Sequence, residues 1–367
     1  MNEHVKADAP HQSAQGHAPA EEAQPQVDAE RVWAHLDGLA KPRRSLGKLE
    51  ELAVRLAATQ RTLQPVVRPR RLVLFAGDHG VVARGVSAWP SEVTGLMVGT
   101  ILMGRASSSA LAAAHDCSVR LVDVGVAGAH VQSAPAFFRD ARVADGTRDL
   151  SVGPAMTSTQ FDAAWHVGVD EAERAVADGC RVLIAGEMGI GNTTPAACLT
   201  MLFTHVSAEV VVGRGAGADD TTLQTKRDIV ARAVARATAA SNASDANLRT
   251  AIEALSGFEI VAMAGFFAAG ARLGATLLVD GYVATSAALI AWHLQPECVH
   301  SMIAGHRSAE PGHGAALSCL ALDPLLDWNM RLGEGTGALV ALPMLDSAVA
   351  LLRDVAALSD LGVARGD

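Results

Sequence analysis

The stretch Leu183-Ile-Ala-Gly-Glu-Met-Gly-Ile-Gly-Asn-Thr-Thr-Pro-Ala-Ala-Cys-Leu199 decides how the rest of the chain is interpreted. The segment 181–185 is a short apolar run, which is typical of a buried parallel strand. A loop with three glycines follows, and a helix start at 192–195 comes next, with capping residues and a proline in the first turn. A strand, a glycine loop and a helix N-terminus in this order favour anion binding, because backbone N–H groups and the helix dipole point at the ligand.

The spacing of this stretch can be compared with the P-loop motif. Gly186-x-x-x-x-Gly191-Asn192-Thr193 fits the frame G-x-x-x-x-G-K-[ST], except that Asn192 stands where the lysine should be. That lysine serves the β- and γ-phosphates, so its absence argues against an ATPase or a GTPase. The loop then suits a monophosphate, while the alternative is a plain tight turn between strand and helix.

Composition limits the classes of protein that fit. The chain has 367 residues, of which 50% are hydrophobic, enough for one large α/β domain and a smaller one. Its formal charge is −9 and no basic patch of the kind that nucleic acid requires is visible. Five scattered cysteines without C-x-x-C spacing predict reduced thiols in a cytoplasmic protein. We expect neither a membrane span nor a signal peptide.

The pattern along the chain predicts four regions. Residues 1–27 lack an apolar period and are expected to be a disordered tail. Residues 28–66 and 343–367 have helical periodicity and could pack together as a small helical domain. Residues 67–342 alternate apolar strands with helices, which predicts a mostly parallel sheet. The expected strand segments of this rhythm are 72–76, 119–124, 181–185, 209–212, 275–279 and 299–304, with a helix over 93–114. Ser45 could cap the helix that follows it in the first helical region.

Polar and glycine-rich residues follow these strands, at the sheet edge where open α/β sheets bind ligands. In Met330-Arg-Leu-Gly-Glu-Gly-Thr-Gly-Ala338, Glu334 has a glycine on each side and little steric cover. Such a carboxylate can be a general base if burial raises its pKa. It can equally be an ordinary carboxylate at a helix N-terminus, stabilised by the helix dipole.

A second set of strand-end residues could hold a metal ion. Asp78 and His79 follow one strand, and His306 and His313 follow another. Their spacings match no strong ligand template, and hydrogen bonding that orients the loops is the competing interpretation.

Taken together, the motifs resemble those of the nicotinate-nucleotide–dimethylbenzimidazole phosphoribosyltransferase family of cobalamin biosynthesis. The matching pieces span nearly the whole chain after the tail. They are Lys41-Pro-x-x-Ser-Leu-Gly-x-Leu49, Phe75-Ala-Gly-Asp-His-Gly80, Gly85-Val-Ser-x-x-Pro90, Gly186-Glu-Met-Gly-Ile-Gly-Asn-Thr-Thr194, Gly213-Arg-Gly-x-Gly217, Asp280-Gly281, Gly305-His-Arg-Ser308 and Arg331-Leu-Gly-Glu-Gly-Thr-Gly337.

The resemblance implies a reaction and a set of site residues. Nicotinate mononucleotide and 5,6-dimethylbenzimidazole would give α-ribazole 5′-phosphate and nicotinate, with inversion at the ribose C1′. Glu334 would be the general base and Ser87 would line the base pocket. The other substrate-binding residues would be Glu187, Gly189, Ile190, Gly191, Asn192, Gly215, Gly217, Lys226, Ser308, Arg331, Leu332 and Gly333.

The family also implies a homodimer, a Rossmann-like large domain and a small helical domain made from both chain ends. It implies no cofactor and no catalytic metal. One departure concerns the base pocket, since family members often carry a Gln after Ser-x-x-Pro and the segment 91–97 has none. The competing functions are a metal-dependent phosphohydrolase and a non-catalytic nucleotide-binding module.

Overall fold

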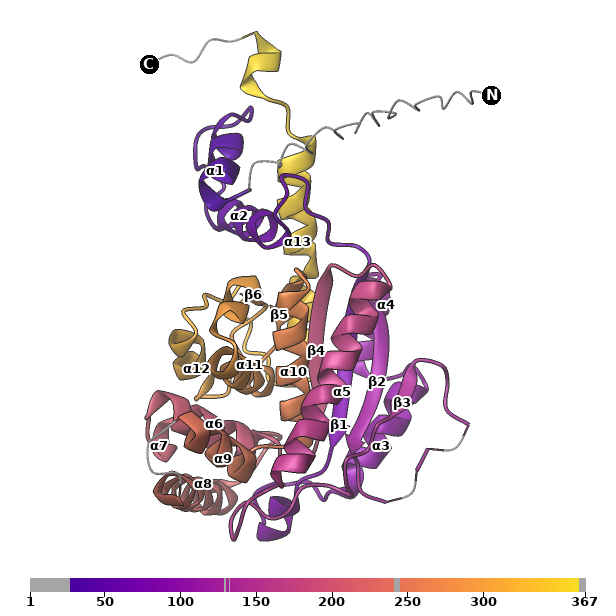
Figure 1. Ribbon diagram of the computed structural model, residues 1–367, viewed down its shortest axis with the longest axis vertical. Coiled ribbons are helices and arrows are strands. Elements are labelled where there is room, and N and C mark those ends of the chain that lie inside the picture. Colours follow the sequence, from indigo (N-terminus) through magenta and orange to yellow (C-terminus); the bar gives the residue numbers. More distant parts are fainter. Residues whose placement is uncertain (1–26, 129, 132, 241–244, 363–367) are drawn as a thin grey trace, which may run out of the picture.

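The protein is built on one six-stranded parallel sheet (Figure 1). The computed structural model describes residues 27–128, 130–131, 133–240 and 245–362, so the predicted tail lies outside the described residues apart from residue 27. The strands are β1 (Arg70–Gly77), β2 (Ser118–Gly125), β3 (Phe138–Asp140), β4 (Val182–Met188), β5 (Thr276–Val279) and β6 (Met302–Ala304). Their order is β3-β2-β1-β4-β5-β6, which is the doubly wound order. Successive strands are added on one side of β1 up to β3 and on its other side from β4 onward, so the order of strands reverses between β1 and β4.

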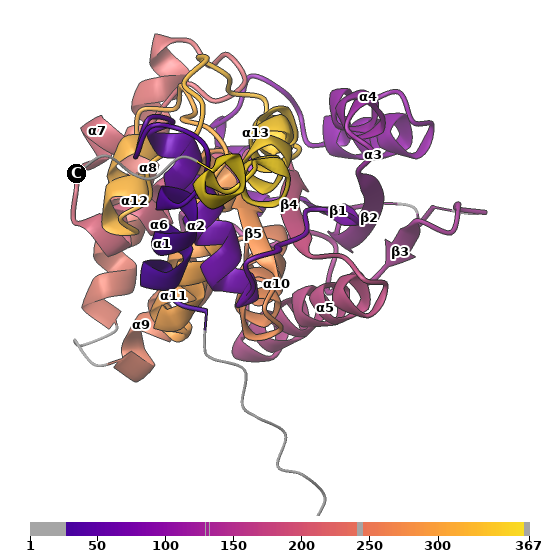
Figure 2. The ribbon, with the colours of Figure 1, turned by 90° about the horizontal axis from the view of Figure 1, so that it is seen from above.

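Helices cover both faces of the sheet (Figure 2). Their bounds are α1 (Ala29–Asp37), α2 (Lys48–Gln60), α3 (Glu92–Leu102), α4 (Ser107–Ala114), α5 (Ser158–Ala177), α6 (Thr193–Thr204), α7 (Ala208–Val211), α8 (Asp220–Ala240), α9 (Asp245–Leu255), α10 (Phe258–Arg272), α11 (Tyr282–Leu294), α12 (His313–Cys319) and α13 (Thr336–Asp354). Short 3-10 turns are η1 (Gly80–Arg84), η2 (Pro296–Ser301) and η3 (Leu358–Leu361). The predicted α/β fold with a mostly parallel, Rossmann-like sheet is confirmed.

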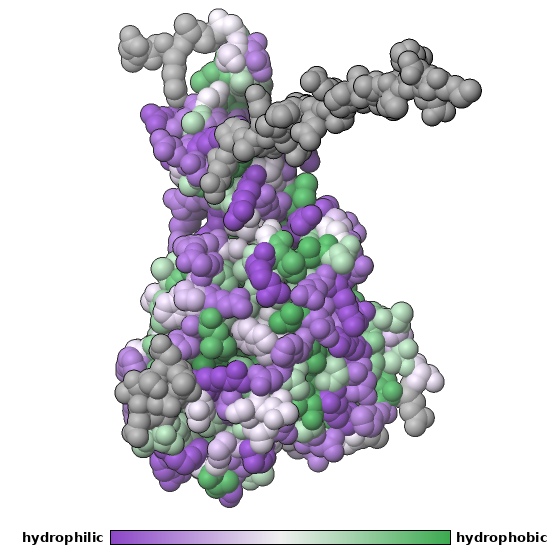
Figure 3. All heavy atoms as spheres, in the orientation of Figure 1, coloured by the Kyte–Doolittle hydropathy of each residue, from purple (hydrophilic) through white to green (hydrophobic). Residues whose placement is uncertain are grey.

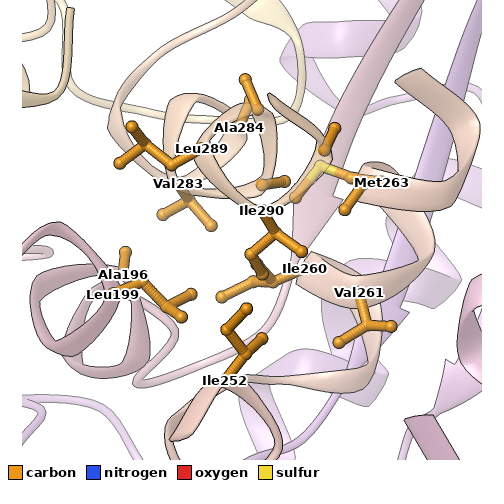
Figure 4. Packing of buried hydrophobic residues seen from close by; sticks show 14 of the residues in the cluster. Ala196, Leu199, Ile252, Ile260, Val261, Met263, Val283, Ala284, Leu289 and Ile290 are labelled. Carbon is orange, nitrogen blue, oxygen red and sulfur yellow. The ribbon is translucent and has the colours of Figure 1, made fainter. Parts of the chain in front are cut away.

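Strand periodicity divides the core into two parts. Val73 and Phe75 of β1 point to one face, where they join a cluster with α5, α6, α10 and α11. Leu72 and Leu74 point to the opposite face and pack with α2, α4 and α13. Because a parallel sheet covered on both sides buries the residues of its central strands, β1, β4 and β5 have continuous apolar runs. Figure 4 shows the close packing of small and branched side chains from α6, α10 and α11 in the first cluster.

Three local expectations are wrong. The segment 209–212 does not form a strand, since its first residues belong to the helix α7. The helix expected over 93–114 is two helices, α3 and α4, broken between Leu102 and Ser107. Ser45 does not cap α2, whose N-cap position is Gly47. The three-residue strand β3 was not expected.

The two ends of the described chain lie together at one end of the molecule, where α1 and α2 pack beside α13 (Figure 1). A bridge joins Leu39 to Ala357, and the guanidinium of Arg44 stacks on Trp33 at 3.5 Å. However, α13 runs without a break from Thr336 through Pro343. The division at 342/343 therefore falls inside a helix, and a separate small domain stays a prediction.

Two helical segments are long and apolar enough to span a membrane by length and composition. One is Thr336–Asp354, in which 61% of an 18-residue apolar stretch is buried in the protein. The other is Glu92–Ala114, in which 28% of such a stretch is buried and which the turn between α3 and α4 interrupts. On the face shown in Figure 3, hydrophilic residues are interspersed with smaller hydrophobic patches.

Candidate active site

A cavity of about 390 Å³ opens at the carboxyl edge of the sheet, beside the point where the strand order reverses. Open α/β sheets bind ligands at this switch point, and the volume is in the range of small-molecule sites. Loops that follow β1, β4 and β5 line the cavity, together with the 214–216 and 331–334 loops. The predicted residues that line it are Ser87, Glu187, Gly189, Ile190, Gly191, Asn192, Gly215, Ser308, Arg331, Leu332, Gly333 and Glu334.

The glycine loop after β4 is held close to β1. A side chain at Gly189 would lie 2.3 Å from the Gly77 carbonyl, and Gly191 has a left-handed φ of +86°. The N–H of Ile190 donates to Thr94 Oγ1 at 3.1 Å, so this group is committed to the protein. The Asn192 amide donates to the Glu187 carboxylate. Asn192 thus holds Glu187 in place as well as lining the cavity.

A second loop, 213–217, is tied to the rest of the site through charged side chains. Lys226 is buried behind it and donates from Nζ to Thr193 Oγ1 at 2.7 Å and to the Gly213 carbonyl at 3.2 Å. Burial lowers the pKa of Lys226 to about 8, against the raising effect of the Glu310 charge. The N–H of Gly215 donates a hydrogen bond to Glu310 Oε1, and the carbonyl of Gly215 accepts one from Arg331 Nη1 at 2.9 Å. Neither Lys226 nor Gly217 is among the residues that line the cavity.

Glu334 is presented by an unusual backbone. Gly333, Glu334 and Gly335 have φ values of +90°, +56° and +73°, so three consecutive residues are left-handed. A non-glycine residue adopts this conformation at a cost of ~1–2 kcal/mol, and such strain is concentrated at functional sites. Asp280 holds the loop by accepting the N–H groups of Gly335 at 3.1 Å and Ala338 at 2.9 Å. Ser108 Oγ donates to Glu334 Oε2 at 2.7 Å.

Several buried carboxylates surround this loop. A side chain at Gly333 would lie 2.1 Å from Glu187 Oε1, which places Glu187 directly against the Glu334 loop. Burial, followed by the charges of Asp280 and Glu259, raises the pKa of Glu187 well above its ordinary value. Burial also raises the pKa of Asp280, although the neighbouring His306 opposes this. Burial and the neighbouring negative charges therefore disfavour the ionised form of Glu187 relative to a carboxylate in water.

Two of the histidines that suggested a metal site, His79 and His313, contact other protein groups. His79 Nε2 lies 2.9 Å from Glu259 Oε1, and both side chains are fully buried. His313 Nδ1 accepts the Ser308 N–H at 2.7 Å, and its Nε2 lies 2.9 Å from Thr285 Oγ1. In the part of the chain that the structure describes, no three His, Cys, Asp or Glu side chains are grouped as a metal site requires.

Residues that line the cavity without having been predicted are of two kinds. Trp89, Val93, Met97 and Met188 form an apolar part of the wall. Trp89 Nε1 donates to the Ala216 carbonyl at 3.2 Å, which links two loops across the cavity. The polar additions are Thr193, Arg214, Asp280, Glu310 and His306, the last of which the sequence suggested only as a possible metal ligand. The sequence indicated Asp280, because an Asp-Gly pair stands directly after an apolar strand. No comparable sequence feature indicated Glu310.

Fold and site together define a class: a Rossmann-like α/β protein with a small-molecule cavity at its switch point and a buried carboxylate on a glycine-flanked loop. A phosphoribosyltransferase family model matches residues 21–363. A nicotinate-nucleotide–dimethylbenzimidazole phosphoribosyltransferase of Thermus thermophilus is 44% identical over 331 residues, which are 90% of this chain and 96% of that protein. The Chromobacterium violaceum enzyme of the same name is 47% identical, covering 89% of this chain and 92% of its own length.

Solved structures agree with the sequence comparison. The crystal structure of CobT from Thermus thermophilus superposes with a TM-score of 0.87 at 43% identity, covering 92% of this chain and 99% of that one. The chain belongs to the nicotinate-nucleotide–dimethylbenzimidazole phosphoribosyltransferase family.

Proposed function

We propose that this protein transfers the phosphoribosyl group of nicotinate mononucleotide to 5,6-dimethylbenzimidazole in cobalamin biosynthesis, giving α-ribazole 5′-phosphate and nicotinate. The names of its relatives support the substrates. One structural observation supports the chemistry most strongly: a nearly buried glutamate, Glu334, lines the cavity from a left-handed loop.

The reaction breaks one C–N bond and forms another at the ribose C1′. Nicotinate leaves as a neutral pyridine ring, taking the electron pair of the bond, so the leaving group needs no acid. The lone pair of one benzimidazole nitrogen attacks C1′ from the opposite side, and the configuration inverts. The proton on the other ring nitrogen then becomes acidic and passes to Glu334. Orientation can supply ~7–11 kcal/mol of barrier reduction, and a placed base ~10²–10⁴ in rate.

Glu334 is the better candidate for the base than its neighbour Glu187. The Asn192 amide donates a hydrogen bond to one oxygen of the Glu187 carboxylate, and Gly333 lies directly against the other oxygen. We therefore assign proton removal to Glu334 and the orientation of substrate to Glu187.

Nucleotide binding falls to the two glycine loops and the cations near them. Arg214 and Arg331 line the cavity, and Lys226 supports the 213–217 loop from behind. Arginine suits planar recognition of phosphate oxygens. In this proposal Gly189, Ile190, Gly191, Gly215 and Ser308 let the ribose phosphate approach the backbone, and Gly217, with its left-handed φ of +106°, shapes the 213–217 loop. Ser87, Leu332 and Gly333 would contact the aromatic base or its edge.

Several wider properties belong to the same proposal. The protein acts as a homodimer in the cytoplasm, without a membrane, nucleic acid, cofactor or catalytic metal. The formal charge of −9 gives no attraction to nucleic acid, and the five cysteines are free. A metal-dependent phosphohydrolase is not favoured, because His79 pairs with Glu259 while His313 binds Ser308 and Thr285.

Product identification tests the proposed function. Purified protein is incubated with nicotinate mononucleotide and 5,6-dimethylbenzimidazole, and products are identified by mass and by the anomeric NMR signal. We expect nicotinate and α-ribazole 5′-phosphate in equal amounts, also in the presence of a chelator. Nucleotide binding without turnover would indicate a binding module, and inorganic phosphate as the product would indicate a hydrolase.

A further inference from the structure

The Glu334 carboxylate is held by a residue distant in the sequence. Ser108 lies in the first turn of α4, and its hydroxyl donates to Glu334 Oε2 at 2.7 Å. Ser108 is completely buried, and Glu334 is 4% exposed. Among the described residues, no other side chain donates a hydrogen bond to the Glu334 carboxylate.

The backbone alone does not fix the direction of this carboxylate. Asp280 anchors the amides of Gly335 and Ala338 and so fixes where the loop enters α13. The two chain neighbours of Glu334 are glycines, so neither has a side chain that could fix its side-chain torsions. The hydrogen bond from the buried Ser108 hydroxyl fixes the direction of Oε2.

We propose that Ser108 is a positioning residue for the transfer reaction: it binds one oxygen of Glu334 and leaves the other, Oε1, to accept the proton of the attacking base. This inference rests on the proposed function of Glu334. The Ser108 hydroxyl keeps its own proton throughout, because it can donate to Oε2 before and after Oε1 is protonated. Ser108 needs no contact with either substrate.

The same helical turn provides a matched control. Ser107 has the same side chain one position earlier and is exposed to solvent. Ser108→Ala removes only the hydroxyl from a small buried side chain, so we expect the fold to be retained. Ser107→Ala removes the same group without touching the site.

The experiment measures kcat, KM and nucleotide affinity by calorimetry in full-length protein. We expect Ser108→Ala to lower kcat by about tenfold to a hundredfold, the usual effect of a misplaced catalytic group. Affinity for nicotinate mononucleotide and thermal stability should match those of Ser107→Ala, which keeps wild-type kcat. Ser108→Thr, which restores a hydroxyl, should recover most of the loss in kcat.

A double-variant comparison separates positioning from a structural role. In a Glu334→Gln background, adding Ser108→Ala should cause little further loss, because both changes remove the same function. A Ser108→Ala kcat within about twofold of wild type would overturn the inference, and so would an equal loss in both backgrounds. Absence of product from the wild-type protein is a distinct result, which would overturn the proposed function itself.

Discussion

At the scale of single residues, His313 shows how burial turns a titratable group into a structural one. Its two ring nitrogens are engaged by Ser308 and Thr285, so the ring must stay neutral for Nδ1 to accept a hydrogen bond. Burial, followed by the charges of His306 and Arg307, lowers the pKa of His313 to about 3 from 6.5. Ser308, which lines the cavity, therefore depends on a neutral histidine.

This shift predicts a dependence of stability on pH. Between pH 6.5 and 3 the unfolded chain binds a proton at His313 that the folded chain does not. Stability is thus fully present above pH 6.5 and is lost as the pH falls, by up to ~1.4 kcal/mol per pH unit. In His313→Asn, which keeps an acceptor for the Ser308 N–H, we expect a shallower decline.

Urea unfolding of the wild type and His313→Asn from pH 7 to pH 5 measures how steeply the free energy of unfolding of each protein changes with pH. The buried carboxylates with raised pKa, Asp78, Glu187 and Asp280, act in the opposite direction. They are present in both proteins, so the comparison removes their effect. Parallel pH profiles for the two proteins would show that His313 is not the residue responsible.

Sequence patterns predicted the location of the site but not its internal contacts. The glycine loop follows an apolar run and Glu334 stands between two glycines, and local sequence is enough to find such residues. Ser108 reaches Glu334 only because α4 packs against α13, and nothing near Ser108 in the sequence indicates this contact. Lys226 was predicted at the ligand but lies behind the 213–217 loop, since pattern does not determine which side of a loop a long side chain takes.

At the scale of elements, the loop between β4 and α6 is limited by contact with β1. Gly189 lies so close to the Gly77 carbonyl that a side chain would separate the loop from β1. The glycine therefore has a packing role in addition to any role in ligand approach.

We expect Gly189→Ala to destabilise the protein by ~1–3 kcal/mol, as overpacking usually does. Affinity for nicotinate mononucleotide should fall as the loop moves. Gly153→Ala is the control, because a Cβ there meets nothing within 4 Å and its φ is not left-handed. Chemical unfolding and calorimetry on both variants make the comparison, and wild-type values for Gly189→Ala would mean that the loop adapts easily.

Elements with long apolar runs were predicted well, while short ones were not. The runs at 72–76 and 181–185 lie largely within β1 and β4. Each strand continues beyond its apolar run. The four-residue run at 209–212 was assigned as a strand but contributes to α7, because so short an apolar segment fits either structure. The strand β3 has only three residues and forms by pairing with β2, a tertiary contact that propensity does not show.

At the scale of the whole molecule, an exposed apolar surface accompanies α3. Leu96 and Met103 are 69% and 66% exposed, and Trp89 nearby is 52% exposed. Such a surface is typical of a protein interface. It supports the proposed homodimer.

We expect light scattering to give twice the mass of one chain for the wild type. Leu96→Glu should shift the protein towards the monomer, because a buried unpaired charge is unfavourable at an interface. Val152→Glu, at a similarly exposed apolar position in a loop away from α3, should remain dimeric. A monomeric wild type would refute the homodimer, and a dimeric Leu96→Glu would place the interface elsewhere.

Turnover of Glu334→Gln, measured beside the wild type with nicotinate mononucleotide and 5,6-dimethylbenzimidazole, tests most directly whether this cavity carries out base-assisted phosphoribosyl transfer. Glutamine keeps the shape of the side chain and accepts a hydrogen bond but cannot take the proton. We predict that kcat falls by ~10²–10⁴ while nucleotide affinity, checked by calorimetry, is unchanged. A kcat within about threefold of wild type would contradict the assignment and leave Glu334 as a helix-terminal carboxylate.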